Sequence, residues 1–171
     1  MFLPHDAPEV KRKGQQVSPE VWTDAKAIIE ATALDLALPL DLPNEDFTTP
    51  EPPAAWVSID VGGDAAETIE LGGLTWEERG AIWVHCMLPF NSGIADGLAW
   101  RKAFSVAFRA AQPTVEGLYY RDHSFDPLSS DDGVWRRLSL VVRYEYDDRL
   151  TNNMLARAKF EGGSGMTATA A

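Results

Sequence analysis

Asp122, His123 and Asp126 are the residues of this chain whose types and spacing suggest chemistry, because carboxylate and imidazole groups bind metal ions. They belong to a stretch rich in serine, aspartate and proline that runs from Asp122 to Gly133. Metal ligands usually sit on rigid elements, whereas this composition is typical of turns. We therefore interpret Asp122 to Gly133 as a polar loop and predict no metal site.

His85 and Cys86 form a second suggestive pair, since a thiolate beside an imidazole is a nucleophile. Both residues fall in a predicted strand, where neighbouring side chains point to opposite faces of the sheet. We therefore expect no contact between the two side chains, and we interpret the single cysteine as a small buried apolar residue. The glycine pairs Gly62-Gly63 and Gly72-Gly73 lack the strand–loop–helix context of a phosphate-binding loop. The sequence thus predicts no catalytic residue and no bound cofactor.

The composition is typical of one globular domain with an acidic surface. The chain has 171 residues, of which 45% are hydrophobic, and this length is sufficient for one hydrophobic core. Its formal net charge is −11, and the one basic cluster, Lys11-Arg-Lys13, is interpreted as part of a solvated arm. No apolar run of about 18 residues is present, and the first residues lack the pattern of a secretory signal. We therefore expect a cytoplasmic protein without a membrane span.

The stretch from Gly80 to Ala111 is the one around which we expect the rest of the fold to be arranged. Its first part alternates so that both faces of a strand are apolar, which predicts a central strand covered on both sides. Pro89 cannot donate a ladder hydrogen bond and ends this strand. Asn91 or Ser92 offers a cap for a helix from Ile94 to Ala111. The polar faces of that helix carry Arg101, Lys102 and Arg109, and its apolar residues recur at helical spacing: Ile94, Leu98, Phe104, Ala107, Phe108 and Ala111.

The rest of the chain supplies a second helix and further strands. Ser18-Pro19-Glu20 has the residue types of a helix start, and the apolar periodicity continues to about Leu36–Leu38. Residues 39–55 contain several prolines and indicate an extended connection. The predicted strands are Trp56–Val61, Ala66–Leu71 after a turn at Gly62-Gly63-Asp64, Leu74–Leu88, Val115–Arg121 and Trp135–Tyr146. The fold class that follows is α+β, a single domain with a mixed, mostly antiparallel sheet of about five strands packed against two helices.

The chain is predicted to consist of a flexible N-terminal arm at residues 1–17, the α+β domain at 18–150 and a flexible C-terminal tail at 151–171. Three segments are expected to lie outside the packed core. The arm, the 39–55 connection and the tail are too polar or too rich in proline to form a core of their own. We therefore expect them to become ordered mainly through neighbouring subunits.

The order of these elements resembles that of the tail terminator, or tail completion, proteins of long-tailed bacteriophages and gene transfer agents. The similar portion runs from about Ser18 to Asp148. Its most family-like pieces are Trp56-Val-Ser-Ile, the strand from Gly80 to Leu88, and Trp135-Arg-Arg-Leu-Ser-Leu-Val-Val-Arg-Tyr-Glu-Tyr. These pieces are patterns of strands rather than catalytic signatures, so the resemblance implies a structural protein and not an enzyme.

The resemblance implies a ring, expected to be a hexamer, that caps the head-proximal end of the phage tail tube and stops its polymerisation. The implied partners are further copies of the chain, the tail tube protein, the head–tail connector protein and the tape measure protein, with no membrane. The implied location is the tail–neck junction of the virion, after assembly in the host cytoplasm. A head–tail connector, or neck protein, or another minor tail protein is the alternative within the same class. A small ligand-binding or hydrolase module built around Asp122–Asp126 is the alternative from another class.

The acidic residues lead to a further expectation about DNA. In such a ring the genome passes through the lumen without specific binding, and acidic side chains that line the lumen repel its phosphates. The candidates lie in predicted turns or strand ends, where we expect solvent to reach them: Asp64, Glu67, Glu77, Glu78, Asp131 and Asp132. We therefore expect the purified protein not to bind duplex DNA.

Overall fold

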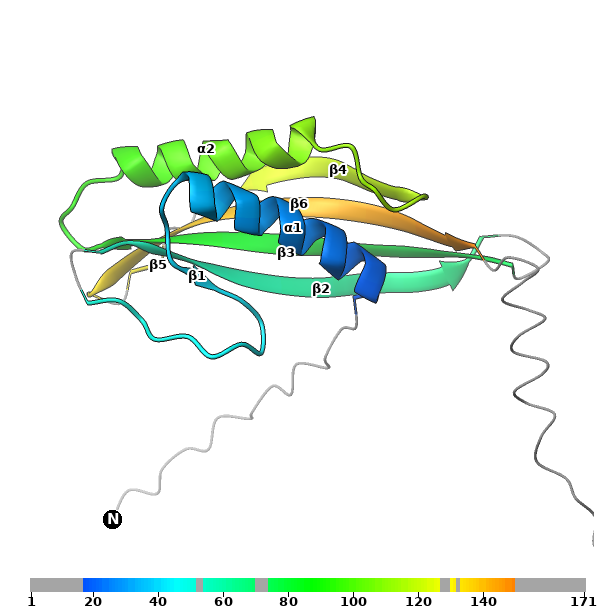
Figure 1. Ribbon diagram of the computed structural model, residues 1–171, viewed down its shortest axis with the longest axis horizontal. Helices are drawn as coiled ribbons and strands as arrows, with labels where there is room; N and C mark the ends of the chain where they lie inside the picture. Colours follow the sequence, from blue (N-terminus) through cyan, green and yellow to red (C-terminus); the bar gives the residue numbers. More distant parts are fainter. Residues whose placement is uncertain (1–16, 52–53, 70–73, 127–129, 132, 150–171) are drawn as a thin grey trace, which may run out of the picture.

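Strand β3 (Thr75–Pro89), the long strand predicted from Leu74 to Leu88, lies in the middle of the sheet in this computed structural model. The structure describes residues 17–51, 54–69, 74–126, 130–131 and 133–149. The other elements are α1 (Pro19–Asp35), β1 (Leu40–Asp41), β2 (Trp56–Thr68), α2 (Ala95–Ala110), β4 (Leu118–Phe125), β5 (Ser130–Asp131) and β6 (Trp135–Arg149). The strand order is β1-β2-β3-β6-β4, and β5 pairs with β6 (Figure 1). Only β1 and β2 pair in parallel among the described strands, so the predicted α+β fold with a mostly antiparallel sheet is confirmed.

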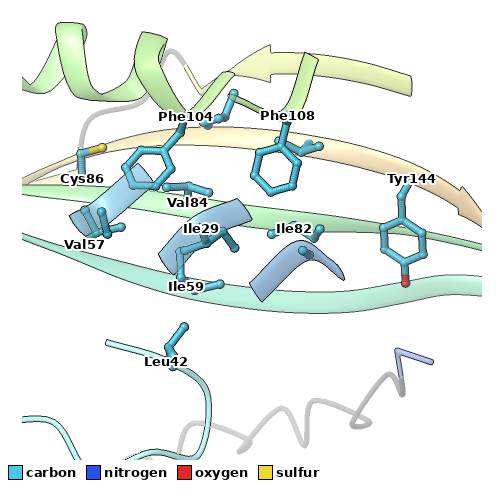
Figure 2. Packing of buried hydrophobic residues seen from close by; sticks show 14 of the residues in the cluster. Ile29, Leu42, Val57, Ile59, Ile82, Val84, Cys86, Phe104, Phe108 and Tyr144 are labelled. Atoms are coloured by element: carbon cyan, nitrogen blue, oxygen red, sulfur yellow. The ribbon is translucent and has the colours of Figure 1, made fainter. Parts of the chain in front are cut away.

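Both helices pack on the same face of the sheet and enclose one hydrophobic core. Figure 2 shows Phe104 and Phe108 of α2 and Ile29 of α1 directed toward this strand face. The strands contribute Val57, Ile59, Ile82, Val84, Cys86, Leu138, Leu140, Val142 and Tyr144 to the cluster. Phe104 and Phe108 are 0% and 1% exposed, which confirms the predicted core face of α2. Ile94 and Leu98 share the predicted apolar spacing but are each 41% exposed, so they lie at the border of that face.

The opposite face of β3 carries no described helix, so the expectation that this strand is covered on both sides is wrong for the part of the chain that the structure describes. Trp83 and Met87 lie half-buried on this face, next to Val141 of β6, which pairs with Trp83. At one end of the sheet, Phe47 packs its ring on Trp56 with the ring centroids 5.0 Å apart. Large neighbouring side chains therefore cover one another on this face, which we call the open sheet face, in place of a second layer.

The predicted turn at Gly62-Gly63-Asp64 is also wrong, because β2 continues through it. The strand shifts its register between Gly63 and Ala65, which is the signature of a β-bulge. Gly80 of β3 pairs with Gly63 and has no room for a side chain, since a Cβ there would overlap the Gly62 carbonyl oxygen and the Tyr144 hydroxyl. The glycines thus allow a close approach of strands rather than a reversal of the chain.

Strand β4 continues into the stretch that was predicted as a polar loop. Asp122 and His123 therefore lie in a strand, with a register shift between Tyr120 and His123. The prediction failed because β4 is an edge strand, where polar side chains face solvent and resemble a loop in sequence. Residues 127–129 and 132 of the predicted loop lie outside the described residues.

Neither predicted helix cap forms a capping side-chain hydrogen bond. The Ser18 hydroxyl and backbone N–H donate instead to the carboxyl group of Glu78 in β3, which ties the start of α1 to the sheet. The Ser92 hydroxyl donates to the carbonyl oxygen of Pro89 at 2.7 Å, and α2 begins after Ile94. Tertiary hydrogen bonding has therefore replaced the local cap at Ser18.

The 39–55 connection is partly ordered by its own chain, against the expectation that neighbouring subunits would order it. Leu40–Asp41 pairs with β2, and Leu42 is buried in the core. Val17 also packs against the core, one residue before the predicted domain start. The arm before Val17 and the tail after Arg149 lie outside the described residues. None of the described helices is long and apolar enough to cross a membrane.

Candidate functional site

A groove of about 550 Å³ lies between α2 and β4. The residues that line it are Leu98, Arg101, Lys102, Ser105, Val106, Arg109, Arg121, Asp122, His123 and Phe125. Arg101, Ser105 and Arg109 recur every four residues along α2, so they share one side of the helix. Four of these lining residues are lysine or arginine, although the whole chain has a net charge of −11. The groove, which we call the basic groove, therefore differs in sign from the chain as a whole.

Helix α1 fixes the position of the groove through a buried carboxyl group. Asp24 accepts hydrogen bonds from the backbone N–H and the hydroxyl of Thr114, both at 2.9 Å, in the connection between α2 and β4. It also accepts a hydrogen bond from the Tyr120 hydroxyl of β4 at 2.9 Å. Burial, followed by the hydrogen bond to Asp24, raises the pKa of the Tyr120 hydroxyl, so it remains a donor. One side chain thus ties the α2–β4 connection and β4 to α1.

His123 lies in the basic groove, where its Nδ1 is 3.0 Å from the Ser105 hydroxyl oxygen. Its ring also meets Phe108 edge to face, with the centroids 6.4 Å apart. Partial burial lowers the pKa of His123, and the Arg109 guanidinium lowers it further, while Asp122 acts in the opposite direction. The imidazole is therefore mainly neutral near pH 7, and the positive charge of the groove comes from arginine and lysine.

The cationic side chains of the basic groove differ in what they contact. Arg121 is paired with Glu145 at 2.7 Å and stacks on Tyr119, with the guanidinium carbon 4.6 Å from the ring centroid. Arg101 lies over the ring of Phe125 at 4.4 Å. Among the described residues, no ion pair with a carboxylate is found for Arg101, Lys102 or Arg109. Three positive charges therefore remain available to an anionic ligand or partner.

Asp122, His123 and Asp126, whose residue types suggested metal ligands, are not grouped in the structure so that they could hold a metal ion. Asp126 follows the end of β4, where its N–H donates to the Ser139 carbonyl oxygen at 3.1 Å. Within the described ranges, no three His, Cys, Asp or Glu side chains are grouped so that they could hold a metal ion. His123 is instead held by Ser105, a contact across two elements that the local sequence pattern does not reveal.

A second polar cluster, which no sequence pattern indicates, runs across the open sheet face. The Nδ1 of His85 is 2.8 Å from the Ser139 hydroxyl oxygen, and its Nε2 is 3.3 Å from a carboxylate oxygen of Asp60. The three residues come from β3, β6 and β2, so no sequence spacing predicts their contact. Burial, assisted by the charge of Arg137, lowers the pKa of His85. The contact with Asp60 is therefore a hydrogen bond from a mainly neutral imidazole near pH 7 rather than an ion pair.

This serine–histidine–aspartate cluster has the residue types of a hydrolase triad but lacks access for a substrate. Ser139 is 1% exposed, whereas a nucleophile must reach the reacting carbonyl carbon. Asp60, which would orient the imidazole, is the exposed member of the cluster. The arrangement satisfies the polar groups of His85 and Ser139 within the sheet, which is a structural role.

His85 and Cys86 lie on opposite faces of β3, as predicted, with Cys86 in the core. Burial raises the pKa of the Cys86 thiol to about 12, so it is not a nucleophile near neutral pH.

The acidic residues proposed to line a lumen are not equivalent. Glu67 is exposed and Glu77 is half-buried, but Glu78 is buried beneath the start of α1, so the expectation that solvent reaches Glu78 is wrong. Its carboxyl group accepts hydrogen bonds from Ser18 and Tyr144. The side chains of Asp64 and Asp131, and the whole of Asp132, lie outside the described part of the structure.

Comparisons with known proteins give information about the fold. No known protein family matches the chain, and no curated protein is similar to it. Several solved structures are similar to the chain, and one of them, whose name states no activity, aligns with a TM-score of 0.55 and 18% sequence identity. The alignment covers 72% of this chain and 94% of that one, so nearly the whole of the other protein has a similar arrangement. At this identity the similarity concerns the α+β fold alone.

Proposed function

We propose that this chain is a structural virion protein that forms a ring at the head-proximal end of a phage tail tube. There it ends polymerisation of the tube and joins the tail to the head connector. The proposal starts from the resemblance of the segment from about Ser18 to Asp148 to the tail terminator proteins. It is supported by the order of helices and strands within one α+β domain. The expected partners are further copies of the chain, in a hexameric ring, together with the tail tube, connector and tape measure proteins.

The observation that carries the proposal is the open sheet face. Trp83, Met87 and Val141 lie on adjacent strands and are half-buried, with no described helix over them. Apolar and aromatic surface of this kind is favourable to cover, and Trp and Met are enriched in the cores of protein interfaces. A subunit that works by assembly requires such a surface, whereas an enzyme requires an accessible reactive group.

The direct experiment is to add the purified protein to tail tubes assembled without it and to image their ends. We expect a ring at one end of each tube and no further growth from that end. Trp83→Glu should prevent capping, whereas Trp76→Glu, which alters an exposed tryptophan outside the open sheet face, should not. Tube ends that remain bare and continue to grow in the presence of folded wild-type protein would contradict the proposal.

The position of the ring distinguishes the proposal from its alternative within the same class. A head–tail connector or another minor tail protein would lie one ring higher or lower in the neck. Labelled protein located in images of intact virions separates these functions directly.

A small ligand-binding or hydrolase module remains the alternative from another class, and the basic groove beside His123 is the observation that favours it. Its test is hydrolysis of a panel of phosphate and carboxylate esters by the wild type and by Ser105→Ala. Turnover that is lost in Ser105→Ala would support this alternative.

A further inference from the structure

Charge is distributed unevenly along this chain. Between Lys26 and Arg79 the sequence contains no lysine, arginine or histidine. The described acidic residues of this stretch before the bulge in β2 are Glu30, Asp35, Asp41, Glu45, Asp46, Glu51 and Asp60. Only Glu30 and Glu45 among them contact a lysine, in both cases Lys26. The segment from Leu42 to Glu51, which we call the acidic connection, thus carries two acidic residues, Asp46 and Glu51, that form no ion pair among the described residues.

The acidic connection and the basic groove lie at opposite edges of the sheet. The acidic connection follows β1, which is the last strand on one side, whereas β4 is the last strand on the other. Figure 1 shows this separation, with β4 and α2 along the upper edge of the molecule and the segment after β1 along the lower edge. The two surfaces therefore cannot meet within one copy of the chain, although their charges are complementary.

The basic groove has the properties of a site for an extended acidic segment. Arg101, Lys102 and Arg109 supply positive charge without described carboxylate partners, and Val106 and Phe125 add exposed apolar surface beside them. Pro43 and Pro50 restrict the backbone of the acidic connection, so less conformational entropy is lost when it binds. Its exposed residues Asp46 and Glu51 provide the opposite charge.

We propose that the basic groove of one copy of this chain receives the acidic connection of a neighbouring copy. The inference rests on the proposed ring function and names the contact that would build the ring. A contact between two different surfaces of identical subunits is heterologous, so it repeats from copy to copy and either closes into a ring or continues as a filament. Because the two surfaces lie at opposite edges of one sheet, each copy can contact one neighbour at each edge.

The contact is testable in the full-length protein by intermolecular paramagnetic broadening. Thr48→Cys places a spin label in the acidic connection without removing an acid, and the buried Cys86 thiol stays unlabelled. In a mixture with unlabelled ¹⁵N-enriched protein, the label should broaden the amide signals of Arg101, Val106 and Phe125. Thr68→Cys, at a threonine that is also exposed and lies at the far end of β2, is the matched control and should leave these signals unchanged.

Two further measurements identify the charges responsible. Arg101→Glu combined with Arg109→Glu in the ¹⁵N-enriched partner should abolish the broadening. Salt should weaken the broadening, because the Debye length falls from about 10 Å at 0.1 M to about 3 Å at 1 M ionic strength.

Broadening that is absent, that is the same for both labels, or that appears on the open sheet face instead would overturn the proposal. Shifts of the groove amides by a short DNA duplex, without broadening by the Thr48→Cys label, would also overturn it and identify nucleic acid as the occupant.

Failure of this interface and failure of the proposed function are distinguishable. If the label gives no broadening at the groove but the protein still caps tail tubes, the interface is wrong and the function stands. If the groove is broadened but tubes are not capped, the interface stands and the function is wrong.

Discussion

The Tyr144 hydroxyl donates a 2.6 Å hydrogen bond to the Glu78 carboxyl group, and the same carboxyl group also accepts from Ser18. These three residues join β6, β3 and the start of α1 at a buried position near one end of the helix. Glu78, at the centre of this contact, therefore has a structural role, unlike the exposed acidic residues that give the chain its net negative charge.

Glu78→Ala should lower the free energy of unfolding by about 1–3 kcal/mol, because it leaves the buried Tyr144 hydroxyl without this acceptor. Urea unfolding followed by tryptophan fluorescence measures the change. Glu67→Ala is the matched control, since Glu67 is exposed, and it should change stability by less than about 0.5 kcal/mol. Equal effects of the two substitutions would show that Glu78 does not have this role.

Phe104→Ala and Phe108→Ala should each cost about 3–5 kcal/mol of stability, because each removes a fully buried aromatic ring from the single core. Val106→Ala on the same helix is the control, as Val106 is exposed and its loss should be small. Thermal melting separates the three variants. Wild-type melting of both phenylalanine variants would contradict the placement of α2 on the sheet.

The pKa of His85, lowered by burial, predicts how stability depends on pH. The unfolded chain binds a proton at His85 at higher pH than the folded chain does, so stability falls as the pH drops below about 6.5, the ordinary pKa of histidine. His85→Gln removes this titrating group and should reduce the loss of stability between neutral and mildly acidic pH. His123→Gln provides the comparison, since His123 has a lowered pKa for the same reason. An unchanged slope in both variants would exclude histidine as its source.

The purified protein should not bind duplex DNA at about 10⁻⁴–10⁻⁶ M, the range in which basic proteins bind non-specifically near physiological salt. The reason is the net charge of −11, which repels phosphate over most of the surface. Fluorescence anisotropy of a labelled duplex gives the measurement. Micromolar binding that weakens steeply with salt, and that is lost in a variant combining Arg101→Glu and Arg109→Glu, would overturn this prediction and assign nucleic acid to the basic groove.

The parts of the fold that the sequence predicts correctly are those indicated by a residue pattern within a single helix or strand. The alternation of Ile82 and Val84 and the helical spacing of Phe104 and Phe108 each lie within one element, and both describe the buried face correctly. The bulge after Gly63 depends on the strand that β2 pairs with, so glycine alone suggested a turn. Ser18 likewise has the type of a helix cap, but a carboxyl group distant in sequence takes its hydrogen bonds.

The candidate site was only partly predictable for the same reason. Arg101, Lys102 and Arg109 were visible in the sequence as a polar side of a helix. Their assembly into a groove depends on β4 running alongside α2, and the polar composition of β4 after Arg121 suggested a loop. The contact of His85 with Ser139 joins two strands and has no local signal at all.

The position of β6 between β3 and β4 has a consequence for how the chain folds during synthesis on the ribosome. β6 is the last of the described strands to be made, yet it fills the middle of the sheet. Until it emerges, β3 has one unpaired edge and β4 has no partner strand, so an apolar strand edge stays open to other nascent chains. We therefore expect ribosome-bound chains that stop before Trp135 to recruit chaperones, and that recruitment should end once β6 is fully exposed.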